Sequence, residues 1–187
     1  MIKLNELMSF TAGQNTARIQ KSCKDDMLYT AEDLDSDLAG SGGNSNIKSD
    51  VDKDYIVKSD DCIICTTRSQ AGITTKATAG KYLNINYVKC RFDRDVLDPW
   101  YFCYIFNESP FIRRQIAMFQ QGTSVSILKL TIKIIGDLSV KALPDIKTQK
   151  TIGSLYRQAL HTEYLMKQRT AQIKQFTLQM LRNVDEN

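Results

Sequence analysis

The sequence predicts an α+β fold, in which a globular domain of mixed strands and helices over residues 1–143 is followed by one long helix over residues 144–187. Three observations favour this fold: a segment that alternates apolar and polar residues, a capped helix start followed by aromatic residues, and a final segment with helical periodicity and no proline. The chain has 187 residues, of which 42% are hydrophobic, so it can bury one core with an appended element.

The first half of the chain contains short elements separated by polar loops. Leu4–Phe10 predicts a strand or turn at the start of the domain. Thr30 can cap a short helix, because its hydroxyl can accept a hydrogen bond from the first helical turn. Gly40–Asn46 is rich in glycine, serine and asparagine and predicts a loop. Tyr55–Val57 and Cys62–Thr66 are rich in β-forming residues and predict two strands.

The second half predicts one alternating strand, two helices and a further strand. Leu83–Phe92 alternates apolar and polar residues, as a half-buried strand does. Asp98-Pro99 and Ser109-Pro110 each predict a helix start, because proline fits the first helical position. Ile127–Leu138 is apolar and rich in β-forming residues, so it predicts another strand.

The final helix, expected from Asp145 to Arg182, has apolar residues at alternating steps of three and four, which is the spacing of a heptad seam. The seam residues are Ile152, Leu155, Ala159, Met166, Ile173, Phe176 and Met180, and Thr162 and Arg169 interrupt it. At ~1.5 Å per residue the helix is on the order of 55 Å long, more than a domain of this size can cover. We therefore expect a second copy to pair with it in an antiparallel coiled coil, giving a homodimer.

Charge is distributed unevenly along the chain. Residues 1–61 have a net charge of −5 and residues 62–182 a net charge of +11, within a total of +4. A surface that faces phosphates needs such a basic segment, because each lysine or arginine beside a phosphate releases condensed counterions. A solvated basic face without a partner is the alternative.

Two polar loops in the basic segment, Thr67–Gly72 and Gln120–Ser126, are the candidate DNA-reading segments. Arginine can bind guanine through two N–H groups, glutamine can bind adenine, and nearby basic residues would contact the phosphate backbone. The candidate DNA-binding residues are Arg68, Ser69, Gln70, Lys76, Lys81, Arg113, Arg114, Gln120, Gln121, Thr123 and Ser124.

No motif predicts a catalytic or metal centre. Asp98-Pro99-Trp100-Tyr101 resembles the Asp-Pro-Pro-Tyr loop of amino-methylating DNA methyltransferases, but tryptophan replaces the second proline and the glycine-rich cofactor loop is missing. Cys62 and Cys65 have CxxC spacing, yet residues three apart in a strand face opposite sides, which favours buried core cysteines. His161, the only histidine, has no neighbouring nucleophile in the sequence. We expect no enzymatic activity, no metal and no cofactor.

The sequence also predicts a cytoplasmic protein without a membrane partner. Its first residues, MIKLNELMSF, contain no apolar run long enough for a signal peptide, and no segment approaches the length of a membrane span. Five cysteines, an odd number, fit no secreted disulfide framework.

A series of short motifs between Tyr55 and Tyr156 occurs in a characteristic order. The motif residues are Tyr55, Ser59–Ile64, Ser69, Gly72, Leu97–Tyr101, Gln121–Ser124 and Leu143–Ile152. In this order and spacing they resemble the specificity subunit of type I restriction–modification enzymes. The residues before Tyr55 match this pattern more loosely.

The resemblance implies a target recognition domain over residues 1–143 that reads one half of a split site in double-stranded DNA. The helix over residues 144–187 would dock the DNA methyltransferase subunit and the restriction or translocase subunit. Family members usually carry two recognition domains and two helices in one chain, whereas this chain has one of each. Two copies paired through their helices would complete the set and prefer a palindromic split site. Two alternatives remain open: a non-enzymatic adaptor whose helix recruits a protein partner, and the inactive product of a half-gene.

Overall fold

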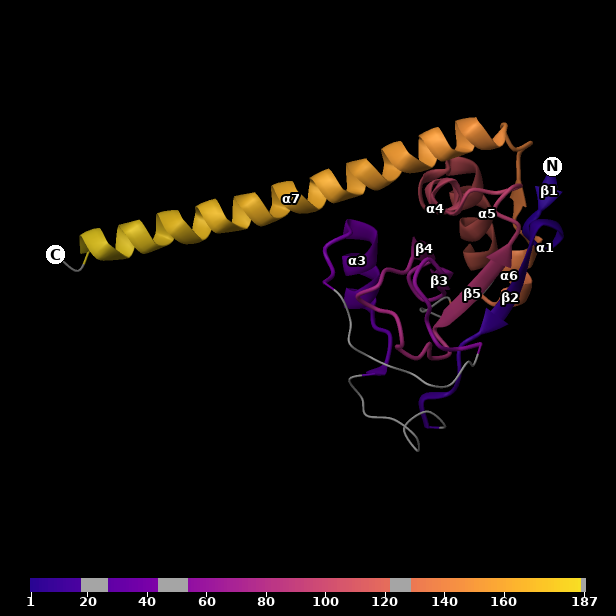
Figure 1. Ribbon diagram of the computed structural model, residues 1–187, viewed down its shortest axis with the longest axis horizontal. Coiled ribbons are helices and arrows are strands. Elements are labelled where there is room, and N and C mark those ends of the chain that lie inside the picture. Colours follow the sequence, from indigo (N-terminus) through magenta and orange to yellow (C-terminus); the bar gives the residue numbers. More distant parts are fainter. Residues whose placement is uncertain (18–26, 44–53, 122–128, 186–187) are drawn as a thin grey trace.

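The computed structural model describes residues 1–17, 27–43, 54–121 and 129–185, and of Gln120 and Gln121 it describes the backbone alone. A mixed α+β domain is joined to one long helix, α7 (Ile146–Asp185), which begins against the domain and extends far beyond it (Figure 1). This arrangement confirms the predicted α+β fold with a long C-terminal helix. No helix in the described ranges is long and apolar enough to cross a membrane.

A four-stranded antiparallel sheet lies at the centre of the domain. In spatial order its strands are β2 (Met8–Ala12), β5 (Tyr87–Phe92), β3 (Cys62–Cys65) and β4 (Gln70–Ile73). A separate two-stranded sheet pairs β1 (Ile2–Lys3) with β6 (Ser139–Val140). The predicted strand at Leu83–Phe92 is confirmed for its second half.

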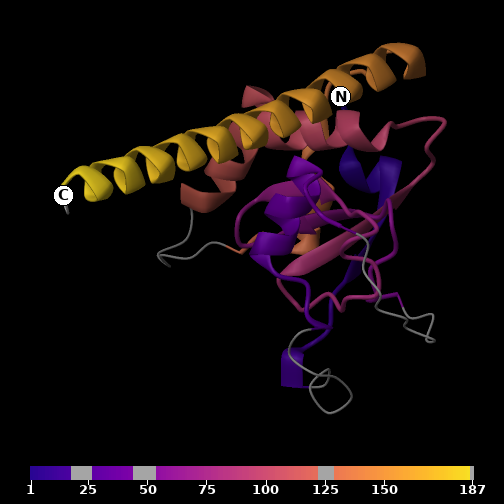
Figure 2. The same ribbon diagram turned by 60° about the vertical axis from the view of Figure 1, so that its left-hand side comes forward.

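Five shorter helices accompany the sheets in the described residues, and Figure 2 shows them from a second direction. They are α1 (Leu4–Leu7), α3 (Ala31–Ala39), α4 (Pro99–Glu108), α5 (Pro110–Gln121) and α6 (Ile132–Asp137). Both predicted caps are confirmed. The hydroxyl of Thr30 accepts a hydrogen bond from the Asp33 N–H at 3.3 Å, and the carboxylate of Asp98 accepts one from the Tyr101 N–H at 2.9 Å.

The two faces of β3 pack into two different apolar clusters. Cys62 and Ile64 contact the larger cluster, which includes Phe102 and Phe106 of α4. Ile63 and Cys65 contact the smaller one, which includes Tyr29 and Leu34 beside and within α3. The two thiols of the CxxC motif therefore face opposite sides of the sheet, as predicted. Burial also raises the pKa of the Cys90 and Cys103 thiols, which keeps them protonated.

The predicted strand at Ile127–Leu138 is wrong. Ile132–Asp137 forms helix α6, which Thr131 caps by accepting a hydrogen bond from the Ile134 N–H at 3.2 Å. Ile135 and Leu138 are fully buried, so the apolar run reflects burial rather than a pleated strand. A short apolar run cannot distinguish a buried strand from a buried helix, because both need the same residues.

Three further expectations need correction. Leu4–Phe10 divides into helix α1 and the first part of strand β2. Tyr55–Val57 contributes a single bridge, from Ile56 to Tyr82, instead of a strand. The predicted loop Thr67–Gly72 is shorter, because its second half forms strand β4 and pairs with β3.

The outer edge of β4 is covered by a side chain of α4. Asn107 is buried, its Oδ1 accepts from the Ala71 N–H at 2.8 Å, and its Nδ2 donates to the Ala71 carbonyl at 2.9 Å. The same Nδ2 donates to the Tyr156 hydroxyl of α7 at 3.2 Å. One amide therefore connects the sheet edge, α4 and α7.

The first turns of α7 are fixed against α4. The buried Gln149 accepts a hydrogen bond from the Asp98 N–H at 3.0 Å and donates to the carbonyls of Val96 and Pro144 at 3.1 and 2.8 Å. Gly153 allows the close approach, because a Cβ there would lie 2.5 Å from Asp98 Oδ1. A residue that lowers helix propensity is therefore needed for the contact between the two helices.

Candidate nucleic-acid interface

One end of the four-stranded sheet gathers polar turns from distant parts of the chain. The turn after β3 is joined to the turn before β5, because the Thr66 N–H donates to the Asn86 carbonyl at 2.8 Å. Lys129 Nζ donates to Asn86 Oδ1 at 3.1 Å, and the Leu130 N–H donates to the Thr66 carbonyl at 3.0 Å. The residues that follow the second predicted loop therefore contact the turn that remains of the first. We define the polar end of the sheet as Thr67, Arg68, Asn84, Asn86 and Lys129.

Arg68 is held at this end by helix α3. Its Nη1 and Nη2 donate to Asp35 Oδ2 and Oδ1 at 3.0 and 2.8 Å, and Nη1 also donates to the Ala31 carbonyl at 3.3 Å. The hydrogen bonds with Asp35 raise the pKa of the Arg68 guanidinium. The side chain is still 38% exposed, so a fixed guanidinium lies at the surface of the polar end.

The two predicted contact residues that follow Arg68, Ser69 and Gln70, differ in burial. Ser69 is only 6% exposed, and its backbone is left-handed with φ of 50°. Its carbonyl accepts a hydrogen bond from Arg113 Nη1 at 3.2 Å. This burial argues against the predicted contact between Ser69 and DNA. Gln70 is half-buried at the start of β4.

The two arginines of α5 differ in their surroundings. Arg113 also donates through Nε to the Asn107 carbonyl at 2.6 Å, so it braces α5 against the turn between β3 and β4. Arg114 is exposed. Gln120 and Gln121 end α5. Thr123 and Ser124, and the side chains of the two glutamines, lie outside the described residues.

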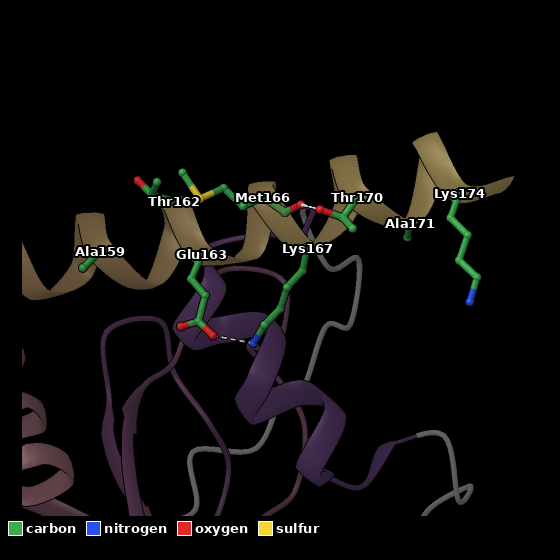
Figure 3. A pocket seen from close by; sticks show the side chains of 8 residues that line it. All are labelled: Ala159, Thr162, Glu163, Met166, Lys167, Thr170, Ala171 and Lys174. Atoms are coloured by element: carbon green, nitrogen blue, oxygen red, sulfur yellow. Dashed lines mark hydrogen bonds and ion pairs between the residues drawn. The ribbon is translucent and has the colours of Figure 1, made fainter. Parts of the chain in front are cut away.

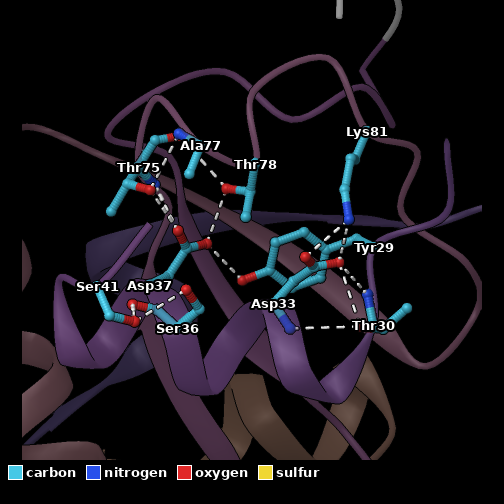
Figure 4. Close-up of polar contacts among 10 residues, drawn as sticks. All are labelled: Tyr29, Thr30, Asp33, Ser36, Asp37, Ser41, Thr75, Ala77, Thr78 and Lys81. Carbon is cyan, nitrogen blue, oxygen red and sulfur yellow. Dashed lines mark hydrogen bonds and ion pairs between the residues drawn. The ribbon is translucent and has the colours of Figure 1, made fainter. Parts of the chain in front are cut away.

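The two predicted lysines lie in the segment that follows β4. Lys81 Nζ lies 2.7 Å from both carboxylate oxygens of Asp33, and its side chain is largely buried (Figure 4). Its charge is thus compensated within the domain. Lys76 is exposed in the same segment.

A buried carboxylate, which no sequence pattern predicted, holds α3 to this segment. Asp37 is 1% exposed and accepts hydrogen bonds from the Tyr29 hydroxyl at 2.7 Å, the Thr75 N–H and hydroxyl at 3.0 and 2.6 Å, and the Thr78 hydroxyl at 2.8 Å (Figure 4). Burial and the nearby Asp37 raise the pKa of Tyr29. The acidic residues of α3 are therefore partners of this domain's own basic and hydroxyl groups.

Helix α7 presents most of the predicted seam to solvent. Ile173 and Phe176 are 57% and 64% exposed, and Leu155, Ala159, Met166 and Met180 are exposed as well. Ile152 is the exception, because it packs against the core of its own domain. The exposed part of the predicted seam therefore begins at Leu155.

The exposed part of α7 is wider than the predicted seam. Leu165, Leu178, Leu181 and Val184 are also exposed. A shallow, open groove of about 760 Å³ runs along α7 and includes the seam residues Ala159 and Met166 (Figure 3). It is lined by Ala159, Thr162, Glu163, Met166, Lys167, Thr170, Ala171 and Lys174. Small side chains at four of these positions leave room for a neighbouring helix.

A second contact ties α7 to α3 at the point where it leaves the domain. His161 Nδ1 lies 2.6 Å from the carbonyl of Ala39 in the last turn of α3. Beyond this contact α7 continues without covering from the described residues of the domain (Figure 1). Among the residues in the described ranges, no group of three or more histidine, cysteine or acidic side chains is suited to hold a metal ion.

No family model matches the sequence, and neither does any curated protein. Solved structures do match the fold. The first belongs to a structure that describes complex assembly and conformational transition of the type I R-M system, with a TM-score of 0.57 and 12% identity over 96% of this chain and 42% of that chain. The second is the S subunit of a type I restriction–modification system from M. genitalium, with a TM-score of 0.47 and 10% identity over 82% of this chain and 36% of that chain. The protein thus has the fold of a type I specificity subunit and spans less than half the length of the chains it matches.

Proposed function

We propose that this chain, which has the fold of a type I restriction–modification specificity subunit, reads DNA sequence for such an enzyme and leaves the chemistry to other subunits. The observation that carries the proposal is the fold likeness itself, because it covers 96% of the chain and so includes both the domain and α7. The polar end of the sheet gives this likeness a local counterpart, since it combines a fixed arginine with amide and hydroxyl groups.

The basic side chains that remain exposed are suited to positioning DNA rather than to reading it. Lys76 and Arg114 are exposed, whereas Lys81 is neutralised by Asp33. Exposed lysine and arginine contribute mainly through phosphates, which carry no sequence information. We therefore assign these two residues to the phosphate backbone and Arg68, with Gln70, to base edges.

The exposed seam of α7 supports a homodimer in which the two helices run antiparallel. In an antiparallel coiled coil, each a position of one helix faces a d position of the other. One register places Leu155 opposite Met180, Ala159 opposite Phe176, Thr162 opposite Ile173, and Met166 opposite Arg169. Small residues then face large ones in two layers, and Ile152 is not needed. Such a dimer holds two reading domains, and a symmetric pair favours a palindromic split site.

The remaining exposed surface of α7 supports docking of further subunits. Leu165, Leu178 and Leu181 lie outside the seam, so they stay available in the dimer. We propose that the DNA methyltransferase subunit and the restriction or translocase subunit bind there. An adaptor that uses only the helix would need the same surface but not the polar end of the sheet.

A salt series of duplex binding tests the DNA-reading function. The logarithm of the binding constant should fall linearly with the logarithm of salt concentration, by about 0.9 for each phosphate contacted. The double variant Arg68→Ala with Gln70→Ala should abolish sequence preference. The double variant Ile173→Asp with Phe176→Asp changes only the seam of α7 and should leave the domain folded. A salt-independent signal, or an unchanged methylation pattern in cells that carry the loop variant with its methyltransferase, would favour the adaptor.

A further inference from the structure

The guanidinium of Arg68 has one occupied edge and one open edge. Three of its five N–H groups are used: Nη1 donates to Asp35 and to the Ala31 carbonyl, and Nη2 donates to the other oxygen of Asp35. Among the described residues, Nε and the second N–H of Nη2 meet no acceptor. These two N–H groups are parallel and lie on the same edge of the planar group.

Resting on the proposed function, we infer that Asp35 is a positioning residue that aims the open edge of Arg68 at a guanine in the major groove. The open edge matches two acceptors side by side, and guanine presents such a pair in O6 and N7. Asp35 and the Ala31 carbonyl fix the plane of the guanidinium on the opposite side. Arg68 is therefore already ordered before DNA binds. A free arginine would lose side-chain entropy on binding, and this loss would weaken the complex.

The location of Asp35 fits this role better than a role in stability. Its side chain is 56% exposed, and exposed ion pairs contribute little to folding because water and salt screen them. The acidic neighbours of Asp35 in α3 are used differently: Asp33 binds Lys81, and Asp37 is buried among hydroxyl groups. Asp35 alone among these three is directed at a residue of the polar end.

Selection from a randomised duplex pool, with the full-length chain, tests the inference. The wild type should enrich guanine at one position per half-site, by roughly five- to a hundred-fold over other bases, as a two-bond arginine–guanine contact does. Arg68→Ala should lose this preference. Asp35→Ala should lose most of this preference, while its affinity for the unselected pool changes by less than about threefold. Replacing guanine by 7-deazaguanine, which lacks N7, should weaken binding of the wild type and have little effect on Asp35→Ala.

Glu32→Ala is the matched control, because it removes one exposed negative charge from the same helix without touching Arg68. It should change the salt dependence as Asp35→Ala does and keep the guanine preference. Thermal unfolding of each variant should match the wild type. Uniform weakening of all sequences in Arg68→Ala would assign Arg68 to phosphate and overturn the inference, as would a full guanine preference in Asp35→Ala. A wild type that selects no sequence at all would instead refute the proposed function.

Discussion

At the scale of single residues, the carboxylates of α3 have partners within the domain, so they add less negative charge to its surface than the sequence of the acidic N-terminal third suggests. Asp33 neutralises Lys81, Asp35 binds Arg68, and Asp37 is buried with hydroxyl partners. The acidic and basic parts of the sequence therefore compensate each other in part within one domain. The net charge of a segment overstates the field that a DNA molecule would meet there.

Replacing the buried Asp37 by alanine should destabilise the domain strongly. The variant would leave the Tyr29 hydroxyl and the donors of Thr75 and Thr78 without their acceptor, at a cost of about 3 kcal/mol in the free energy of unfolding. Urea unfolding followed by circular dichroism measures this change. Glu32→Ala, at an exposed position of the same helix, should change it by less than about 0.5 kcal/mol. Equal effects of the two substitutions would contradict the role of Asp37.

At the scale of elements, sequence signals succeed where their cause is local. Thr30 and Asp98 predict helix starts because a cap acts within three residues of its own position. Ile127–Leu138 fails because packing, not local preference, decides between helix and strand there. Gly153 looks like a weak point of a helix in the sequence, and only the approach of α4 explains it.

The candidate site was predictable to a similar extent. Composition identifies the polar turn that contains Arg68, but it does not reveal that Asp35, 33 residues away, holds this arginine. The burial of Ser69 depends on pairing between β3 and β4, which no single segment encodes. Contacts of long sequence separation are therefore the part that sequence reasoning misses.

Gly153→Ala should destabilise the seat of α7 even though alanine is the better helix former. The new methyl group would meet Asp98 Oδ1 and backbone of α4, so the two helices must separate. We expect a loss of about 2 kcal/mol in the free energy of unfolding, against a gain of about 1 kcal/mol from helix propensity alone. Ser154→Ala, at the next and exposed position, is the control and should be neutral or slightly stabilising. A stabilised Gly153→Ala variant would show that the close contact is absent.

At the scale of the whole molecule, the domain and α7 differ in how much of their apolar surface the chain itself buries. The domain buries two apolar clusters on either side of its sheet. Helix α7 spans 40 residues, about 60 Å, and exposes large apolar side chains over most of that length. Isolated apolar faces of this extent are typical of helices that bind another helix.

Two variants test the antiparallel dimer. Ile173→Asp with Phe176→Asp should convert it to a monomer in sedimentation velocity, because two charges would be buried at the seam in each copy. Gln168→Asp with Gln175→Asp adds the same charge away from the seam and should leave the dimer intact.

The register has its own measurement. A chain with Ala159→Cys and Phe176→Cys should form cross-links between copies under oxidation, because the proposed register places these positions opposite each other. Within one helix they are about 25 Å apart and cannot react. A monomeric wild type, or equally strong cross-linking when Gln175→Cys replaces Phe176→Cys, would refute the register.

The amide of Asn107 has a further consequence for how copies of this protein can associate. An edge strand with unpaired backbone N–H and C=O groups can pair with strands of other molecules, which leads to aggregation. At β4 both backbone groups of Ala71 are already taken by Asn107. Addition of a strand from another copy is therefore blocked at this edge of β4. The protein can be kept at high concentration without intermolecular strand pairing there, even though α7 exposes an apolar seam.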